Sequence, residues 1–253
     1  MNQSFPAQPV AMISGGLGDI GKAAAHAMQR SGCRVSIGDV HPTSLADGRV
    51  HYYQVDVSNE ASVVAWFDAV ESHFGQTASV IVANAAIVTI GSVMTATVEE
   101  WNRTMHVNLT GAWLTARTGA QRMLAAGLPG RIVFVGSWAG HAPHVHIAAY
   151  CAAKAGLRML AQTMALELAD KDILVNEVAP GYVDAGLSGQ FFKKNAGEAE
   201  RARAVVPNKR LIEAEEVAQA IAYLCSPHHR NLTGSTLLID GGLSLQHGRE
   251  HRD

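Results

Sequence analysis

Short runs of apolar, mostly β-branched residues alternate with longer helical patterns along the whole of this chain. Seven runs have the length and composition of strands. Most are apolar throughout, which indicates strands covered on both faces. These runs are Val10–Ser14, Arg34–Gly38, Val50–Val55, Ala78–Ala83, Arg131–Gly136, Ile173–Val178 and Thr236–Ile239. Strand–helix alternation with short connections favours right-handed crossovers, so the sequence predicts an α/β fold: a doubly wound, seven-stranded parallel sheet with helices on both faces.

Helical patterns fill the intervals between these strands. They are Ile20–Arg30, Ser58–Phe74, Val98–Ala126, Ala148–Ala169 and Ala214–Cys225. Thr97 and Glu100 have capping-box spacing, so the third helix should begin there. No linker, low-complexity tract or repeat interrupts the pattern, which predicts a single domain over residues 1–253. Residues 184–210 are rich in glycine and charge, and we expect this long irregular insertion to form a lid over a site.

Composition excludes several classes of protein. The chain is 48% hydrophobic and 17% charged with a formal net charge of −2, which carries no sign of nucleic-acid or membrane binding. Its three cysteines match neither a disulfide framework nor a zinc pattern, which suits a reducing compartment. No signal-peptide pattern or membrane-spanning apolar run is present. We therefore expect a cytoplasmic protein that holds no metal.

The stretch SGGLGDIG, residues 14–21, follows the first predicted strand and opens a helix. Glycines allow a tight turn and a close approach of backbone N–H groups to a phosphate, and the helix N-terminus adds partial positive charge. Asp39 follows the second strand, where a carboxylate can accept hydrogen bonds from the ribose of NAD and repel the extra phosphate of NADP. Asp56 and Asn84 follow the third and fourth strands, where they could hold adenine or fix the backbone.

A candidate proton-transfer unit follows the fifth strand. Tyr150 and Lys154 are four residues apart and so share one face of a helix. A nearby ammonium favours the phenolate and lowers the pKa of a tyrosine, which makes the pair suitable for acid–base work. Ser137, at the end of the strand, could donate a hydrogen bond to a substrate oxygen. Asn108 lies within the long pattern Val98–Ala126, where asparagine is an indifferent helix former.

Taken together, these motifs resemble the short-chain dehydrogenase/reductase family over essentially the whole chain. The cofactor loop T-G-x-x-x-G-x-G of that family is similar to residues 14–21, and its N-A-G motif resembles residues 84–86. Its catalytic Asn, Ser, Tyr and Lys correspond to Asn108, Ser137, Tyr150 and Lys154. Its Pro-Gly motif corresponds to Pro180-Gly181, and residues 240–242 look like its C-terminal Asp-Gly-Gly. The resemblance implies a Rossmann fold that binds a nicotinamide dinucleotide.

The chain departs from the family pattern at four positions. Ser14 keeps the hydroxyl of the usual threonine, Ala86 replaces the glycine of N-A-G, and Ala185 replaces a threonine that often holds the nicotinamide amide. Asp19 replaces the middle glycine of the loop. We expect Asp19 to cap the helix that it starts, to point away from the pyrophosphate, and to add to the discrimination against NADP.

The resemblance also implies the roles of individual residues. Tyr150 would exchange a proton with the substrate oxygen, Lys154 would bind the nicotinamide ribose, Ser137 would hold the substrate oxygen, and Asn108 would position a water. The implied cofactor-binding residues are Ser14, Gly15, Gly18, Asp19, Ile20, Gly21, Asp39, Asp56, Val57, Asn84, Ala85, Tyr150, Lys154, Pro180, Gly181 and Val183. The implied substrate-binding residues are Ser137, Ala139, His144, Tyr150, Gly181 and Phe191.

The expected activity is an NAD-dependent interconversion of a secondary alcohol and a ketone. The expected substrate is a sugar, polyol or hydroxy acid, and NADP is the less favoured cofactor. Histidines at 141, 144 and 146, Trp138 and the basic residues of 184–210 suit such substrates. One alternative is a 3-oxoacyl-thioester reductase, and another is a non-catalytic dinucleotide-binding regulator. The family commonly forms tetramers, so we expect a homotetramer or a homodimer built on the helices Val98–Ala126 and Ala148–Ala169.

Overall fold

The computed structural model describes residues 4–43, 50–195 and 197–246, so the predicted domain of 1–253 includes residues outside these ranges. Seven parallel strands form one sheet in the order β3-β2-β1-β4-β5-β6-β7. The strands are β1 (Val10–Ser14), β2 (Arg34–Asp39), β3 (Val50–Gln54), β4 (Val80–Ala83), β5 (Gly130–Val135), β6 (Ile173–Pro180) and β7 (Thr236–Ile239). The order reverses between β1 and β4, where a doubly wound sheet opens its ligand crevice. The predicted fold class is confirmed.

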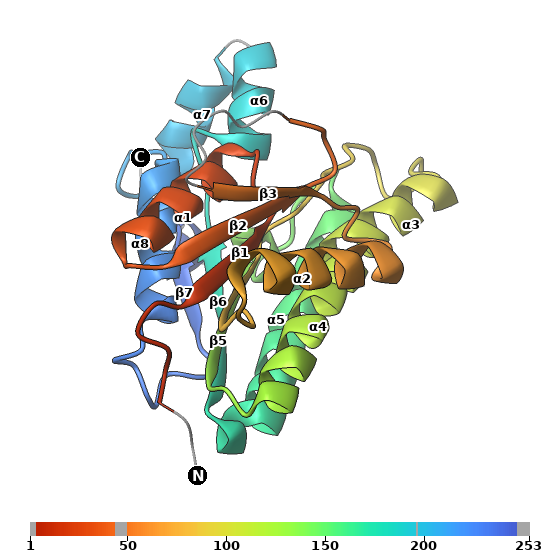
Figure 1. The fold of residues 1–253 in the computed structure, drawn as a ribbon. Helices are drawn as coiled ribbons and strands as arrows, with labels where there is room; N and C mark the ends of the chain where they lie inside the picture. The colour runs from red at the N-terminus through yellow and green to blue at the C-terminus, as the bar shows by residue number, and fades with distance from the viewer. Residues whose placement is uncertain (1–3, 44–49, 196, 247–253) are drawn as a thin grey trace.

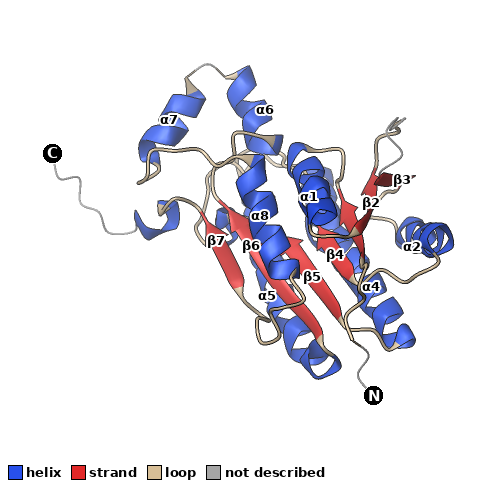
Figure 2. Ribbon diagram, turned by 60° about the vertical axis from the view of Figure 1, so that its left-hand side comes forward, coloured by secondary structure: helices blue, strands red, loops and turns tan. Residues whose placement is uncertain are grey.

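Helices cover both faces of this sheet (Figure 2). Their bounds are α1 (Asp19–Arg30), α2 (Glu60–Phe74), α3 (Val98–Met105), α4 (Ala112–Ala126), α5 (Ala148–Leu168), α6 (Gly186–Lys194), α7 (Glu198–Val205) and α8 (Ala214–Cys225). The helices α2, α4 and α5 share one hydrophobic core, and α1 and α8 share the other. Side chains alternate along each strand, so Phe134 of β5 packs in the first core and Val133 in the second.

The edge strands differ from the central ones. Most of β3 and β7 is only half-buried, because each has a neighbouring strand on one side alone. The expectation of burial on both faces therefore holds for the central strands and is wrong for these two.

Two helical expectations are corrected by the structure. The single helix predicted over 98–126 is divided into α3 and α4 by the π-helix His106–Gly111, which contains Asn108. The segment 184–210, predicted to be irregular, forms α6 and α7, which lie beyond one end of the sheet (Figures 1 and 2). The start of the third helix is as predicted, since Thr97 and Glu100 form both hydrogen bonds of a capping box.

Within the described ranges, no helix is both long enough and apolar enough to cross a membrane.

Candidate active site

Hydrogen bonds between the ends of β1 and β4 hold the strand-order reversal together. Ser14 Oγ accepts from the backbone N–H groups of Asn84 and Ala85, at 3.0 and 3.1 Å. The Asn84 side-chain amide donates in return to the carbonyl oxygens of Ser14 and Gly15, at 2.9 and 3.1 Å. The sequence left open whether Asn84 holds adenine or fixes the backbone, and these hydrogen bonds show that it fixes the backbone. The hydroxyl that Ser14 shares with threonine accepts two of these four hydrogen bonds.

The glycines of the loop are needed for close contact. Gly15 has a φ of 63°, and a Cβ there would lie 2.8 Å from Ala85 Cα. A Cβ on Gly21 would lie 2.2 Å from the Gly15 carbonyl oxygen. Gly18 is the N-cap of α1, and no described side chain caps this helix. The first turn of α1 therefore directs N–H groups into a backbone cradle that side chains leave open, which is a typical place for a phosphate.

Asp39, the last residue of β2, contacts the glycine loop through its side chain. Its Oδ2 accepts from the backbone N–H of Leu17 at 3.1 Å, and its Oδ1 accepts from the N–H of His41 at 3.1 Å. The carboxylate is nearly buried at the carboxyl end of β2. The structure thus places the carboxyl group of Asp39 against the glycine loop.

The predicted role of Asp19 as a cap of its own helix is wrong. Asp19 is the first residue of α1 rather than its N-cap, and its Oδ2 accepts a hydrogen bond of 2.8 Å from the backbone N–H of Gly186. Gly186 is the first residue of α6 and has a φ of 56°. Asp19 therefore joins the glycine loop to the segment after β6, a contact between residues that are distant in sequence.

Asp56 and Val57 lie just after β3. Asp56 is exposed, and its Oδ1 accepts from the N–H and hydroxyl of Ser58, at 2.9 and 2.7 Å. Val57 is buried against Gly111 at the end of the π-helix, where a Cβ would lie 2.8 Å from a Val57 methyl group. The sequence left open whether Asp56 holds adenine or fixes the backbone, and these hydrogen bonds show that it fixes the turn after β3. Val57 packs against the segment that carries Asn108 and so helps to position it.

The predicted catalytic side chains of β5 and α5 lie together. Lys154 Nζ lies 5.5 Å from the centroid of the Tyr150 ring and donates a 2.7 Å hydrogen bond to the Val135 carbonyl oxygen. Ser137, directly after β5, hydrogen-bonds with Tyr150 and accepts from the N–H of Ala139 at 3.1 Å. Burial raises the pKa of Tyr150 to about 12, which the Ser137 hydrogen bond opposes. Burial lowers the pKa of Lys154 to about 8, which the charge of Glu177 opposes.

Asn108 is fully buried in the π-helix. Its Oδ1 accepts from the Ile87 N–H at 2.9 Å, and its Nδ2 donates to the Ile87 carbonyl oxygen at 2.8 Å. The side chain therefore anchors the loop after β4 to the helix beside the site. A π-helix has one more residue in each hydrogen-bonded ring than an α-helix, a feature often found at functional sites.

An aromatic cluster extends from the Ser137 loop to α6. The ring centroids of Trp138 and His144 lie 4.1 Å apart, those of Trp138 and Tyr182 5.4 Å, and those of Tyr182 and Phe192 6.3 Å. Phe191, which is exposed, contacts Phe192 at the outer end of the cluster. The cluster brings the predicted substrate residues His144 and Phe191 to one side of the site.

Backbone contacts position the remaining predicted residues. The Gly181 N–H donates to the Ile239 carbonyl oxygen at 2.7 Å directly after Pro180, where β6 ends, and Val183 pairs with Ile212. Ala139 is buried in the turn that follows Ser137. These contacts hold the residues after β5 and β6 at the edge of the sheet that carries the glycine loop.

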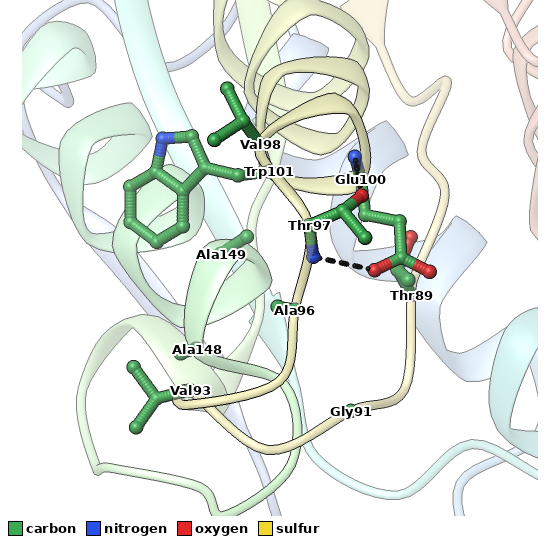
Figure 3. A pocket seen from close by; sticks show the side chains of 10 residues that line it. All are labelled: Thr89, Gly91, Val93, Ala96, Thr97, Val98, Glu100, Trp101, Ala148 and Ala149. Carbon is green, nitrogen blue, oxygen red and sulfur yellow. Dashed lines mark hydrogen bonds between the residues drawn. The ribbon is translucent and has the colours of Figure 1, made fainter.

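A separate pocket lies beside the start of α5 (Figure 3). It is lined by Thr89, Gly91, Val93, Ala96, Thr97, Val98, Glu100, Trp101, Ala148 and Ala149. None of these is a predicted site residue. Val98 is 70% exposed beside it, so this hollow belongs to an apolar outer surface rather than to the crevice.

Sequence reasoning missed three residues near Lys154: Glu177 on β6, Arg158 on α5 and Thr236 on β7. Glu177 is fully buried in β6, and its Oε2 accepts a 2.6 Å hydrogen bond from Thr236. The available signal was a charged residue inside the apolar run ILVNEVAP. A buried carboxylate needs partners that repay its desolvation, which makes such a residue worth noting in any predicted strand.

Comparison with known proteins identifies the family of this chain. A family model described as enoyl-(acyl carrier protein) reductase matches residues 16–244. The chain belongs to the short-chain dehydrogenase/reductase family. The cis-4-hydroxycyclohexanecarboxylate dehydrogenase of Sinomonas cyclohexanicum is 36% identical over 252 residues, which span 96% of this chain and 98% of the relative.

Two further members illustrate the range of this short-chain dehydrogenase/reductase family. The NADP-dependent (R)-specific alcohol dehydrogenase of Lentilactobacillus kefiri is 32% identical over 247 residues, 94% of this chain and 97% of the relative. A short-chain type dehydrogenase/reductase from Mycobacterium marinum has a TM-score of 0.87 and 29% identity, and the match covers 95% of this chain and 96% of that one. The present chain is therefore an oxidoreductase, and its family binds a nicotinamide dinucleotide.

Proposed function

We propose that this chain is an NAD-dependent dehydrogenase that interconverts a secondary alcohol and a ketone. The observation that carries the proposal is the meeting of Tyr150, Lys154 and Ser137 after β5, at the same edge of the sheet as the glycine loop after β1. Oxidation of an alcohol removes a hydride from carbon and a proton from oxygen. When bound, the dinucleotide accepts the hydride in this direction and supplies it in the other.

The protein's own residues handle the proton. Tyr150 takes the alcohol proton in oxidation and returns it to the carbonyl oxygen in reduction. The Lys154 ammonium stabilises the phenolate, because an opposite charge nearby favours the ionised form. Ser137 holds the substrate oxygen against Tyr150. Asn108 anchors the loop after β4, and we propose that it also positions a water between Lys154 and solvent.

The site fits a dinucleotide, with a preference for NAD. The glycine cradle and the uncapped start of α1 suit a pyrophosphate, which Gly15, Gly18, Ile20 and Gly21 would approach. Asp39 would meet the adenosine ribose and repel a 2′-phosphate. Asp19 adds a second negative charge at the loop. The remaining residues of the predicted cofactor set lie at the ends of β1, β3, β4 and β6 and on α5.

The substrate that we propose is a sugar, polyol or hydroxy acid, with a cyclic hydroxy acid first among them. Trp138, His144 and Tyr182 present aromatic faces and edges on which a ring can pack. Lys193 and Lys194 end α6 and are exposed, where they would attract a carboxylate. The relative from Sinomonas, named for a ring that bears a hydroxyl and a carboxylate, supports this choice.

Relatives named 3-oxoacyl-[acyl-carrier-protein] reductase, from Vibrio cholerae and Rattus norvegicus, favour a second candidate, a 3-oxoacyl-thioester reductase. A third candidate is a regulator that binds a dinucleotide without turnover. One experiment separates them: purified protein is given cyclic hydroxy acids, sugars, polyols and a 3-oxoacyl thioester, with NAD(H) and NADP(H) in parallel. We expect the largest kcat/KM with a hydroxy acid and NAD, and its loss in Tyr150→Phe while NADH still binds. Turnover that survives in Tyr150→Phe would refute the proposed mechanism.

We further propose that the chain assembles as a homotetramer in the cytoplasm. Trp113 and Leu124 on α4 and Met159 and Leu166 on α5 are large apolar side chains that are exposed in the single chain. Such a surface is typical of helices that are covered in an assembly. Sedimentation of the protein as a monomer would contradict the proposal.

A further inference from the structure

Lys154 is a buried cation whose hydrogen-bond acceptor is neutral. Its side chain is 2% exposed, and Nζ donates to the carbonyl oxygen of Val135. A buried ammonium without a counter-charge loses several kcal/mol of hydration free energy and tends to give up its proton. A lysine that must stay charged beside Tyr150 therefore needs a carboxylate in the protein itself.

Glu177 lies where that carboxylate is needed. It is 0% exposed in β6, beyond direct ion-pair distance of Lys154, and its charge raises the pKa of that lysine. Its Oε1 has no hydrogen-bond partner among the described residues and faces Gly136, where a Cβ would lie 1.9 Å from that oxygen. Gly136, between the end of β5 and Ser137, thus leaves room for a carboxylate that a side chain there would displace.

The groups around Glu177 are arranged for an anion. From β7, Thr236 donates its hydroxyl to Oε2. From α5, the positive charges of Lys154 and Arg158 both act on the carboxyl. Arg158 donates to His141 Nδ1 at 2.8 Å, which leaves the proton of a neutral His141 on Nε2, and Nε2 lies 3.9 Å from Glu177 Oε2. Every one of these neighbours presents positive charge or an N–H or O–H group.

We propose that Glu177 is the buried counter-ion of Lys154 and holds its ammonium in the charged state beside Tyr150. Glu177 is a positioning residue in this proposal, because it acts on the substrate through Lys154 and Tyr150. The proposal rests on the proton-transfer role of Tyr150 given above. It adds a carboxylate from β6 to the residues that set the pH range of the enzyme.

The direction of the effect follows from the charges. Burial raises the pKa of Glu177, which Thr236, Lys154 and Arg158 oppose, and Glu177 in turn raises the pKa of Lys154 toward its ordinary value. Without Glu177, the pKa of Lys154 falls further below about 8, so Lys154 loses its proton at a lower pH. Tyr150 then ionises less readily, and alcohol oxidation needs a higher pH.

The first test needs no turnover. The free energy of unfolding in urea is measured for wild type, Lys154→Met, Glu177→Gln and the double variant, without cofactor. We expect the loss in the double variant to be smaller than the sum of the two single losses, because each single change leaves a buried charge unpaired. A second cycle pairs Glu177→Gln with Arg158→Met. Additive losses with Lys154, or coupling to Arg158 alone, would overturn the proposal.

The second test is the pH profile of alcohol oxidation. We expect the pH of half-maximal kcat in Glu177→Gln to rise by about one unit, which lowers kcat about fivefold at the wild-type midpoint. Glu167→Gln, an exposed carboxylate on the same helix α5, is the control and should not move the profile. If Glu177→Gln does not fold, Thr236→Val removes the donor to Oε2 and should shift the profile the same way. A uniform loss of kcat with an unmoved profile would overturn the inference, whereas a wild type without turnover would overturn the proposed function alone.

Discussion

Substitution of Gly136 by alanine tests how tightly the buried carboxylate is packed. Gly136 follows β5, is buried, and is not among the glycines with positive φ, so alanine fits its backbone conformation. The added Cβ would lie 1.9 Å from Glu177 Oε1 and 2.7 Å from its Cδ. An ordinary contact needs at least about 3.4 Å, so the carboxylate must move by more than 1 Å. Its other oxygen is hydrogen-bonded to Thr236 at 2.6 Å, which resists that movement.

The expected cost follows from this geometry. Overpacking of a close-packed core costs about 1–3 kcal/mol, and displacement of the carboxylate also weakens a charge-assisted hydrogen bond. For a chain of this size, each kcal/mol corresponds to a fall in Tm of roughly 2–4 °C. Urea and thermal unfolding of wild type and Gly136→Ala measure the difference. Gly91→Ala is the matched control, because a Cβ there meets nothing within 4 Å, and its stability should be that of wild type within about 0.5 kcal/mol.

The cost should also depend on Glu177. In a Glu177→Ala background the new methyl group no longer meets the carboxylate, so Gly136→Ala should become much less destabilising. If Gly136→Ala is as stable as Gly91→Ala, or costs the same in both backgrounds, then Gly136 does not make room for Glu177 and the packing argument fails.

Three further predictions concern the cofactor loop, α6 and an edge of the sheet. Asp39→Ser removes the charge against the glycine loop. The ratio of kcat/KM with NADP to kcat/KM with NAD, measured with both cofactors, should rise by about tenfold or more. An unchanged ratio would contradict the role assigned to Asp39. Asp19→Asn weakens an exposed charge-assisted bond to Gly186, so hydrogen exchange of α6 should quicken while Tm falls little; unaltered exchange would contradict the contact. His51 has its pKa lowered by burial and by His73, so the folded state binds fewer protons than the unfolded one. Stability should therefore fall as the pH drops below about 6.5, and less steeply in His51→Gln, as measured by urea unfolding at several pH values.

Local patterns in the sequence were sufficient for the architecture and for most of the candidate site. Apolar runs separated by helical patterns predict a doubly wound sheet because both periods are properties of neighbouring residues. The capping box at Thr97 and the four-residue spacing of Tyr150 and Lys154 are equally local, so they could be read before any folding. The positions at which polar residues follow strands were enough to place the crevice, because parallel strands end on the same edge of a sheet.

Contacts between distant segments could not be read in this way. Asp19 was assigned to its own helix because only the neighbouring N–H groups are visible in the sequence, whereas folding brings the N–H of Gly186 within 2.8 Å. Asn108 in the π-helix is hydrogen-bonded to Ile87, which lies on another segment, and tertiary contacts of this kind can override local helical propensity. Glu177 is a charged residue in an apolar run until β5 and α5 surround it with Gly136 and Lys154. The sequence by itself determined the strands, the glycine loop and the chemical groups of the site. The tertiary structure decided which charges face one another, because electrostatic energies depend on distance and burial, which only the packed chain defines.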